Sequence, residues 1–443
     1  MWKKYPEKDL QPNHVNEHGQ VTDERMLHDA RKKIGIGNVL YSSEENSLGA
    51  LTTVIIRHLG GDSFHLGIFG ATMGISNLFS WSGTLLLKKY NSDRKAMTAA
   101  LTIAAALAFF IAISILLPSH FSAYKPFSLW SYLILGVLFT ALGGTLKNIE
   151  NSWIGDLVPE SKRGWFSSYK WIVYVVAGLM FNFLFSRMGD LWPSSKTYAG
   201  FYIIFVISFF IVIPIFQTIV DRTPKNANFI ASGATHHDRL NYRSLPFWCY
   251  VTYMAIWAGG RSLLFAFSAA YMFDQFHFSL TKLTLVNIGQ PIASIIALLF
   301  FGKITDKKGN RIPLIIISLI LVASMLLWVS TAWLGWMPIV VYAILSSLGW
   351  ANGNMLQTNL ALEIFPDKGR CGYMAVTSLA TGIIGITSVV GAGALMRHIQ
   401  GWSISVLGAT LNHYHLIFAI GTIISFISII PLFIMGKRTV KEI

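Results

Sequence analysis

Long apolar segments alternate with short polar ones along most of the chain. Each apolar segment holds about 20 residues, which is long enough to cross a bilayer as a helix with all its backbone hydrogen bonds made internally. The pattern predicts an all-α integral membrane protein of twelve transmembrane helices. Their expected ranges are 34–58, 64–87, 96–118, 128–151, 165–187, 198–220, 246–274, 279–302, 312–335, 338–361, 371–395 and 414–436.

The composition agrees with this pattern and excludes an ordinary water-soluble protein. Of 443 residues, 53% are hydrophobic and 13% are charged, whereas soluble domains carry about 25% charged residues. The first range, 34–58, has the least regular pattern, because Ser42 to Asn46 lie at its centre. We retain it because omitting it would put the basic segment 88–95 on the opposite side of the membrane from the other basic segments.

The net charge of +14 reflects topology rather than nucleic-acid binding. With both termini inside, 26 Lys and Arg lie in cytoplasmic segments, 6 lie at outer ends and loops, and 3 lie within helices. This bias predicts a multi-pass protein of the cell (inner) membrane with cytoplasmic tails at 1–33 and 437–443. The tail 1–33 has no apolar core of a signal peptide, and the part after Thr22 has some helical character.

The polar segment 221–245 divides the helices six and six. We expect an N-terminal six-helix bundle at 34–220, a cytoplasmic linker, and a C-terminal six-helix bundle at 246–436. The linker contains His236, His237 and Asp238, but no matched ligands accompany them. No metal site and no cofactor are expected.

The two halves repeat each other at their cytoplasmic loops. The chain reads acid, two apolar residues, Pro, acid, two residues, Arg both from Asp156 to Arg163 and from Glu363 to Arg370. A second pair of similar segments, 83–91 and 302–310, lies between the second and third helices of each half. Matches at equivalent places indicate a parallel duplication about an axis normal to the membrane.

The segment Gly302-Lys-Ile-Thr-Asp306-Lys-Lys-Gly309-Asn-Arg311 resembles the loop signature of the major facilitator superfamily. The resemblance covers nearly all of 34–436, and the stretch from Trp153 to Gly164 is similar to a poorly described bacterial branch. It implies two bundles in pseudo-two-fold arrangement around a central cavity. The first half departs from the signature, since Leu87 replaces the acid and Tyr90 the glycine.

In this family such loop charges form an inner gate, and the resemblance implies the same here. An acid at one helix end is stabilised near the N-terminus of another helix, where the macrodipole is positive. Asp306 would approach the helix that begins near Gly164, with Arg163 close by. The alternative is that these charges only flank helices and set topology. The candidate gating residues are Asp306, Arg311, Asp156, Arg163, Glu363 and Arg370.

Two adjacent acids, Glu44 and Glu45, lie near the middle of the first helix. At 3.6 residues per turn Glu45 shares a polar face with Tyr41 and Ser42, and the resemblance implies that this face lines the central cavity. Neighbouring carboxylates in a partly dry site favour proton uptake by at least one of them. We therefore interpret Glu44 and Glu45 as the coupling site for a proton, or for sodium; the alternative is that they only solvate a wet cavity.

Three basic residues also lie within predicted helices. Arg261 follows Gly259 and Gly260, and it is expected to bind an anionic substrate group or to pair with an acid of the first helix. A fixed structural ion pair is the alternative. Lys170 and Lys147 are both expected to extend to the inner surface. For Lys147 the alternative is a pair with Glu150 at i,i+3.

Amides and aromatic residues within helices suit a polar organic solute, although hydrogen bonding between helices is an equal alternative. With Arg261, the candidate substrate-binding residues are Tyr41, Asn77, Trp81, Asn182, Asn287, Gln290, Asn354 and Gln357.

These features predict a secondary transporter that moves a small organic solute by alternating access, coupled to a proton or sodium. A sugar-like or other polar solute is preferred, and an exporter of amphipathic compounds comes second. A receptor that does not transport is a further alternative. A membrane enzyme is a poor fit because no nucleophile with a base, no nucleotide-binding loop and no metal motif is present. Partners are expected to be the solute, the ion and lipids, without nucleic acid, and the chain is expected to be a monomer.

Overall fold

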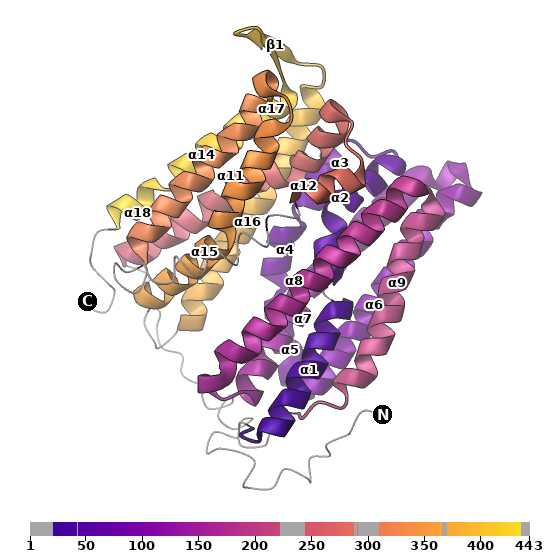
Figure 1. Ribbon diagram of the computed structural model, residues 1–443, viewed down its shortest axis with the longest axis vertical. Helices are drawn as coiled ribbons and strands as arrows, with labels where there is room; N and C mark the ends of the chain where they lie inside the picture. The colour runs from indigo at the N-terminus through magenta and orange to yellow at the C-terminus, as the bar shows by residue number, and fades with distance from the viewer. Residues whose placement is uncertain are drawn as a thin grey trace. The chain divides into compact units, whose positions relative to one another are not determined.

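The chain folds into long helices and one β-hairpin, grouped in two compact units (Figure 1). The computed structural model describes residues 21–41, 43–221, 244–287, 290, 310–365 and 370–435. The first unit comprises Met1–Gly60 and Ile75–His237, and the second comprises Gly61–Gly74 and Asp238–Ile443. The segment Gly61–Gly74 therefore packs with the second unit, although it lies in the first half of the sequence.

In the first half of the chain helices follow one another with short connections. They are α1 (Glu24–Tyr41), α2 (Ser43–His58), α3 (Ser63–Gly70), α4 (Thr72–Phe79), α5 (Trp81–Tyr90), α6 (Asp93–His120), η3 (Ser122–Tyr124), α7 (Lys125–Leu157), α8 (Glu160–Leu191) and α9 (Ser195–Phe216).

The second half adds further helices and the hairpin. They are α11 (Leu245–Phe276), α12 (Leu280–Asn287), α14 (Arg311–Leu334), α15 (Met337–Ile364), α16 (Arg370–His398), β1 (Ser403–Val406), β2 (Ala409–Asn412), α17 (His413–Ile427) and α18 (Ile430–Ile434). The strands pair antiparallel, with Val406 opposite Ala409 at the turn.

Within the described residues, eight helices are long and apolar enough to cross a membrane. Their ranges are Asp93–Ser119, Lys125–Ile154, Ile172–Leu191, Ser195–Phe216, Arg311–Leu334, Met337–Ala361, Tyr373–His398 and His413–Ile434. Each coincides with a predicted span.

The other four predicted spans are less regular in the structure. The 34–58 span begins earlier, at Glu24, and comprises two helices on either side of residue 42. The 64–87 span is not one helix, because the chain turns at Ala71 and Ser80 between α3, α4 and α5. The 246–274 span is the continuous helix α11, and most of the 279–302 span lies outside the described residues.

Aromatic side chains fill the core of each unit. In the first, α6 packs against α7 and α9, and Phe185 stacks on Phe201 at 4.6 Å between ring centroids. In the second, α11 packs against α16 and α17, and α14 against α15. There Phe247, Phe365 and Tyr373 form a buried cluster. Large apolar side chains also point outward, as Phe110 and Leu326 do, which suits a lipid-facing surface.

Glycines bring α3 and α16 together in the second unit. A Cβ on Gly67 would lie 2.9 Å from the Val389 carbonyl oxygen and 3.0 Å from the Gly393 Cα. A Cβ on Gly74 would lie 2.9 Å from the Gly382 carbonyl oxygen. Backbones this close have no room for side chains, as in small-residue contacts between membrane helices. Gly382 and Gly393 of the 371–395 span thus serve close helix packing, whereas a Cβ on Gly385 or Gly391 would meet nothing within 4 Å.

A polar contact lies at one end of this packing. Asp62 caps the N-terminus of α3, where it accepts hydrogen bonds from the backbone of Phe64 and His65. His65 Nδ1 lies 2.6 Å from Asp62 Oδ1, and Arg397 Nε lies 3.3 Å from Asp62 Oδ2. The segment is therefore attached to the second unit by both close packing and an ion pair.

Gly393→Ala is expected to destabilise the second unit. Its Cβ would lie 3.0 Å from the Gly67 Cα and 3.0 Å from the Ser63 carbonyl oxygen, and overpacking of this kind costs about 1–3 kcal/mol. The measurement is the melting temperature in detergent. Gly391→Ala is the matched control, because nothing lies within 4 Å of a Cβ there and alanine is the better helix former. An equal loss in both variants would contradict close packing at Gly393.

The Asp62 cap is expected to stabilise the protein in a pH-dependent way. Burial opposes ionisation of Asp62, but hydrogen bonds from His65 and the charges of His65 and Arg397 outweigh it and lower its pKa below 3.8. A lowered folded-state pKa gives a stabilisation that is complete above 3.8 and is lost as the pH falls through the folded value. Asp62→Asn keeps the cap and removes the charge. Its melting temperature should lie below wild type near neutral pH, and the gap should narrow below about pH 4.

Candidate substrate site

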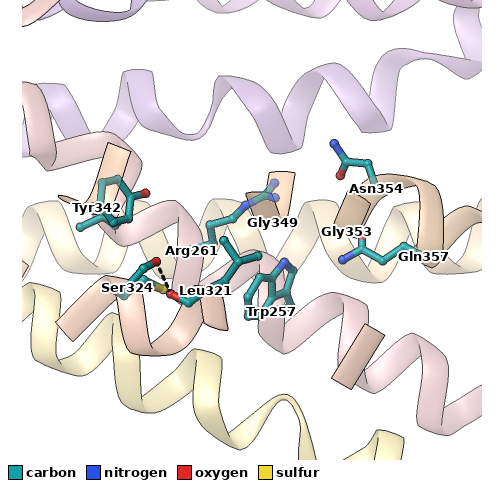
Figure 2. Close-up of a pocket in the computed structure, with 11 residues that line it drawn as sticks. Trp257, Arg261, Leu321, Ser324, Tyr342, Gly349, Gly353, Asn354 and Gln357 are labelled. Atoms are coloured by element: carbon teal, nitrogen blue, oxygen red, sulfur yellow. Dashed lines mark hydrogen bonds between the residues drawn. The ribbon is translucent and has the colours of Figure 1, made fainter. Parts of the chain in front are cut away.

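A small pocket lies among α11, α14 and α15 in the second unit (Figure 2). Helical periodicity places its lining residues on one face of each helix. On α11 they recur at i, i+4 and i+7, on α14 at i, i+3 and i+4, and on α15 at seven- and four-residue intervals. The lining residues are Trp257, Arg261, Leu264, Leu321, Ser324, Met325, Tyr342, Gly349, Gly353, Asn354 and Gln357.

Arg261 is the charged residue of this lining. It lies in the middle of α11, one turn after Trp257, and Figure 2 shows it beside Trp257 and Gly349. Its guanidinium carbon lies 5.8 Å from the centroid of the Phe265 ring. A cation this deep in an apolar helix is stabilised by aromatic faces and by polar neighbours.

A hydrogen-bonded group holds the opposite end of the pocket. Gln357 Nε2 donates to the Tyr253 hydroxyl at 3.1 Å, and the Tyr250 hydroxyl donates to the Gln357 carbonyl oxygen at 2.9 Å. The Tyr253 hydroxyl also contacts Ser318 Oγ at 3.1 Å. Gln357 is therefore held in one orientation, whereas Asn354, one turn before it, is exposed.

Trp257 presents an unused donor at this site. The residue is 3% exposed, and its ring stacks near Tyr253 with 6.2 Å between centroids. Its indole Nε1 has no hydrogen-bond partner within the described part of the chain. Leaving a buried donor unsatisfied costs about 1–3 kcal/mol. A solute oxygen in the pocket would satisfy it.

Two glycines of α15 line the pocket. A Cβ on Gly349 would lie 2.3 Å from Leu321 Cδ2, so the leucine fills the space above that glycine. A Cβ on Gly353 would lie 3.8 Å from Ile317 Cγ2, which is an ordinary van der Waals contact. Gly349 therefore lets Leu321 of α14 pack directly on α15, whereas the Gly353 position would accept a methyl group.

Of the predicted substrate residues, Arg261, Asn354 and Gln357 come together at this pocket. Asn287 instead donates to the Leu283 carbonyl oxygen at 3.1 Å, and Gln290 lies 3.4 Å from Ser346 Oγ. These two amides make helix-to-helix or local contacts, the alternative that the sequence left open.

Two other predicted residues lie in the first unit. Trp81 is exposed, and Asn182 accepts a hydrogen bond from Ser186 Oγ at 3.3 Å. The side chains of Tyr41 and Asn77, and those of the proposed coupling acids Glu44 and Glu45, lie outside the described residues.

Sequence reasoning missed Trp257, Tyr342 and Ser324 as lining residues. Trp257 had a usable signal, since it precedes Arg261 by one helical turn. Tyr342 and Ser324 had none, because their faces are decided by how α14 and α15 rotate against α11.

The predicted gating residues that the structure describes make local contacts in the second unit. Arg311 donates from Nε to the Leu432 carbonyl oxygen at 2.7 Å and from Nη2 to the Phe433 carbonyl oxygen at 2.9 Å. Glu363 accepts a hydrogen bond from Asn310 Nδ2. Asp306 and the side chains of Asp156, Arg163 and Arg370 lie outside the described residues, and their gating role stays a prediction.

The expectation for Lys170 was wrong, because its Nζ lies 2.9 Å from Glu150 Oε2 and the side chain reaches into the first unit rather than to the surface. Lys147, by contrast, is exposed. The cause is the rotation of α8 against α7, which brings a lysine of one helix to a buried acid of the other.

Tyr253→Phe is expected to destabilise the protein by about 1–3 kcal/mol, because it leaves the buried Gln357 amide without an acceptor. The melting temperature in detergent reports the change. Tyr124→Phe is the control, since Tyr124 is 53% exposed. Similar melting temperatures for Tyr253→Phe and wild type would show that the hydroxyl does not fix Gln357.

Comparison with known proteins agrees with this architecture. Residues 247–442 match the family model of the Major Facilitator Superfamily. No curated protein matches the chain.

Solved structures are similar over nearly the whole chain. A mutant of the nucleoside transporter NupG has a TM-score of 0.69 at 13% identity and covers 93% of this chain and 100% of its own. A D-xylose–proton symporter has 0.65 at 17%, covering 93% and 98%. The inward-open xylose transporter XylE from E. coli has 0.64 at 14%, covering 91% and 95%. At these identities the likeness shows the fold, which is the twelve-helix fold expected from the sequence.

Proposed function

We propose that this chain is a member of the major facilitator superfamily, whose family model its second half matches and whose fold it shares, and that it moves a small polar organic solute across the membrane by alternating access. The family and fold are those of a transporter and not of an enzyme. The substrate class rests on the pocket around Arg261.

The pocket supports a solute rich in oxygen atoms. Arg261 is a permanent cation with several N–H donors, and the Trp257 indole adds a donor that has no acceptor among the residues that the structure describes. Tyr342 and Asn354 contribute a hydroxyl and an amide. Such sites distinguish a polar solute from an apolar one of similar size, because unmet donors penalise the wrong ligand. A sugar-like compound or a polar solute with an anionic group fits this set of donors.

The apolar side of the pocket supports the second candidate. Leu264, Leu321 and Met325 line it together with the Trp257 ring. These side chains would accept the hydrophobic part of an amphipathic compound, and such a solute would be exported from the cell. Trp257 and Arg261 would then bind its polar end.

Proton or sodium coupling through Glu44 or Glu45 remains part of the proposal, as do an inner-membrane location with both termini cytoplasmic and action as a monomer. Adjacent carboxylates on a helix that lines a cavity suit ion uptake because they repel each other.

The first experiment is a thermal-shift screen of the purified protein against sugars, nucleosides, organic anions and amphipathic drugs, at two pH values. A stabilising compound is then tested for flux in proteoliposomes. Binding without flux would indicate a receptor, and stabilisation by amphipathic drugs alone would favour the exporter.

Arg261→Gln is expected to weaken binding of the compound identified in that screen by about 10- to 100-fold, since a hydrogen bond to a charged group contributes about 1.5–3 kcal/mol. Titration by calorimetry measures the change. Lys147→Gln is the control, because Lys147 is exposed in the other unit. Unchanged affinity in a folded Arg261→Gln variant would remove the pocket from the proposed function.

A further inference from the structure

The hairpin that connects α16 to α17 has one apolar face and one polar face. Side chains alternate along a strand, and residues directly opposite each other in an antiparallel pair point to the same side of the sheet. The observed register therefore sorts the strand residues by polarity. The apolar face comprises Ile404, Val406, Ala409 and Leu411, and the polar face comprises Ser403, Ser405, Thr410 and Asn412.

Helices cover part of the apolar face and leave the rest open. Strand β2 packs against α14 and α17, and Ala409 is buried. By contrast, Ile404 on β1 is 48% exposed, Leu407 at the turn is 90% exposed, and Trp402 just before β1 is 38% exposed. The whole connection 399–412 contains no Asp, Glu, Lys or Arg. An uncharged apolar surface of this kind marks a place of contact with another surface.

The turn of the hairpin holds a large apolar side chain in a strained conformation. Leu407 has φ +49° and Gly408 has φ +78°, as in the two-residue turns that suit hairpins. Asn, Asp and Gly adopt this left-handed region readily, whereas a leucine is sterically disfavoured there. Leu407 thus combines backbone strain with nearly complete exposure, and strain of this kind is typical of functional positions.

From these observations we infer that the hairpin is a lipid-binding element, whose apolar face and Leu407 tip lie in the interfacial layer of the membrane. The inference depends on the membrane location of the chain and not on the proposed solute. The hairpin connects two helices that contain the candidate spans Tyr373–His398 and His413–Ile434, so both of its ends are tethered to the same membrane surface. Figure 1 shows it at one end of the second unit, beyond α17.

The backbone of the hairpin limits how deep it can lie. A two-stranded sheet has two edges whose N–H and C=O groups have no strand partner, and such groups are costly in the hydrocarbon core. The headgroup layer still supplies water to these edges and accepts apolar side chains, and Trp is enriched at this depth. The polar face then points to water, as in other elements that lie on a membrane rather than cross it.

Asn412 holds the base of the hairpin in place. Its Oδ1 accepts hydrogen bonds from the backbone N–H groups of Tyr414 at 3.1 Å and His415 at 3.4 Å, and this contact caps α17. Its Nδ2 donates to Gln275 Oε1 of α11 at 3.0 Å. The helices therefore set the orientation of the two faces, and contact with lipid at the hairpin is linked to α11 and α17.

Other occupants fit this surface less well. A stable protein–protein interface buries about 800 Å² on each partner, which is far more than a two-stranded hairpin with a few exposed apolar side chains offers. The connection also lacks the charges that steer and select a protein partner. The C-terminal tail of this chain follows the far end of the span that starts at His413, so it begins at the other membrane surface.

The test compares two neighbouring residues on opposite faces. Ile404→Cys and Ser405→Cys are each labelled with a small environment-sensitive fluorophore, in a chain whose Cys249 and Cys371 are replaced by Ser, and are reconstituted as single copies in phosphatidylcholine nanodiscs. The label at 404 is expected to emit at shorter wavelength, to be quenched by nitroxide-labelled lipid and to lose most of its quenching by aqueous iodide. The label at 405, an exposed position as well, should show the reverse. A label at Leu407→Cys should behave like the label at 404.

The inference is overturned if the labels at 404 and 407 are as open to iodide as the label at 405. Protection that appears only in discs with two copies would assign the surface to a second chain and would overturn it as well. Leu407→Asn in the chain labelled at 404 keeps the turn, because Asn tolerates a positive φ, and it should reduce quenching by the lipid nitroxide. Unchanged quenching would contradict lipid contact at the tip. A single symmetric gel-filtration peak checks that each variant is folded.

Discussion

A charged side chain among apolar helices needs a partner within reach, because lipid and packed side chains cannot hydrate it. This constraint shapes both units. In the first, Glu150 has an amide on one oxygen and an ammonium on the other. In the second, Arg261 faces a pocket whose other polar groups come from α14 and α15. Each of these charged residues lies where several helices meet, so its surroundings depend on how those helices pack.

The same constraint separates structural from functional polar groups. Arg311 donates to the backbone carbonyl oxygens of Leu432 and Phe433 in α18, and these hydrogen bonds resemble a helix C-cap. Trp257 differs, because its buried indole N–H has no acceptor among the described residues. An unmet donor beside a pocket is a more specific sign of a ligand than the presence of an amide or a charge. It supports the placement of the substrate site on the second unit's helices.

Close backbone packing, more than charge, attaches the segment Gly61–Gly74 to the second unit. The segment Gly61–Gly74 joins the second unit because glycines let its backbone approach that of α16, and Asp62 and Arg397 then meet at the end of the contact. Without side chains at Gly67 and Gly393, dispersion between two backbones provides most of the attraction. A short apolar helix thus becomes part of a unit other than the one its sequence position indicates.

The sequence by itself determined the membrane class, the positions of most helices and the relation to a transporter family, because these depend on local hydrophobicity and on short loop motifs. It also identified Arg261, Asn354 and Gln357, since a polar residue in an apolar helix is conspicuous. It did not reveal Trp257 or Tyr342 as their neighbours, or the choice of Lys170 over Lys147 by Glu150. These side-chain contacts depend on how each helix is rotated about its axis and on how closely it approaches its neighbours. Only tertiary packing determines both.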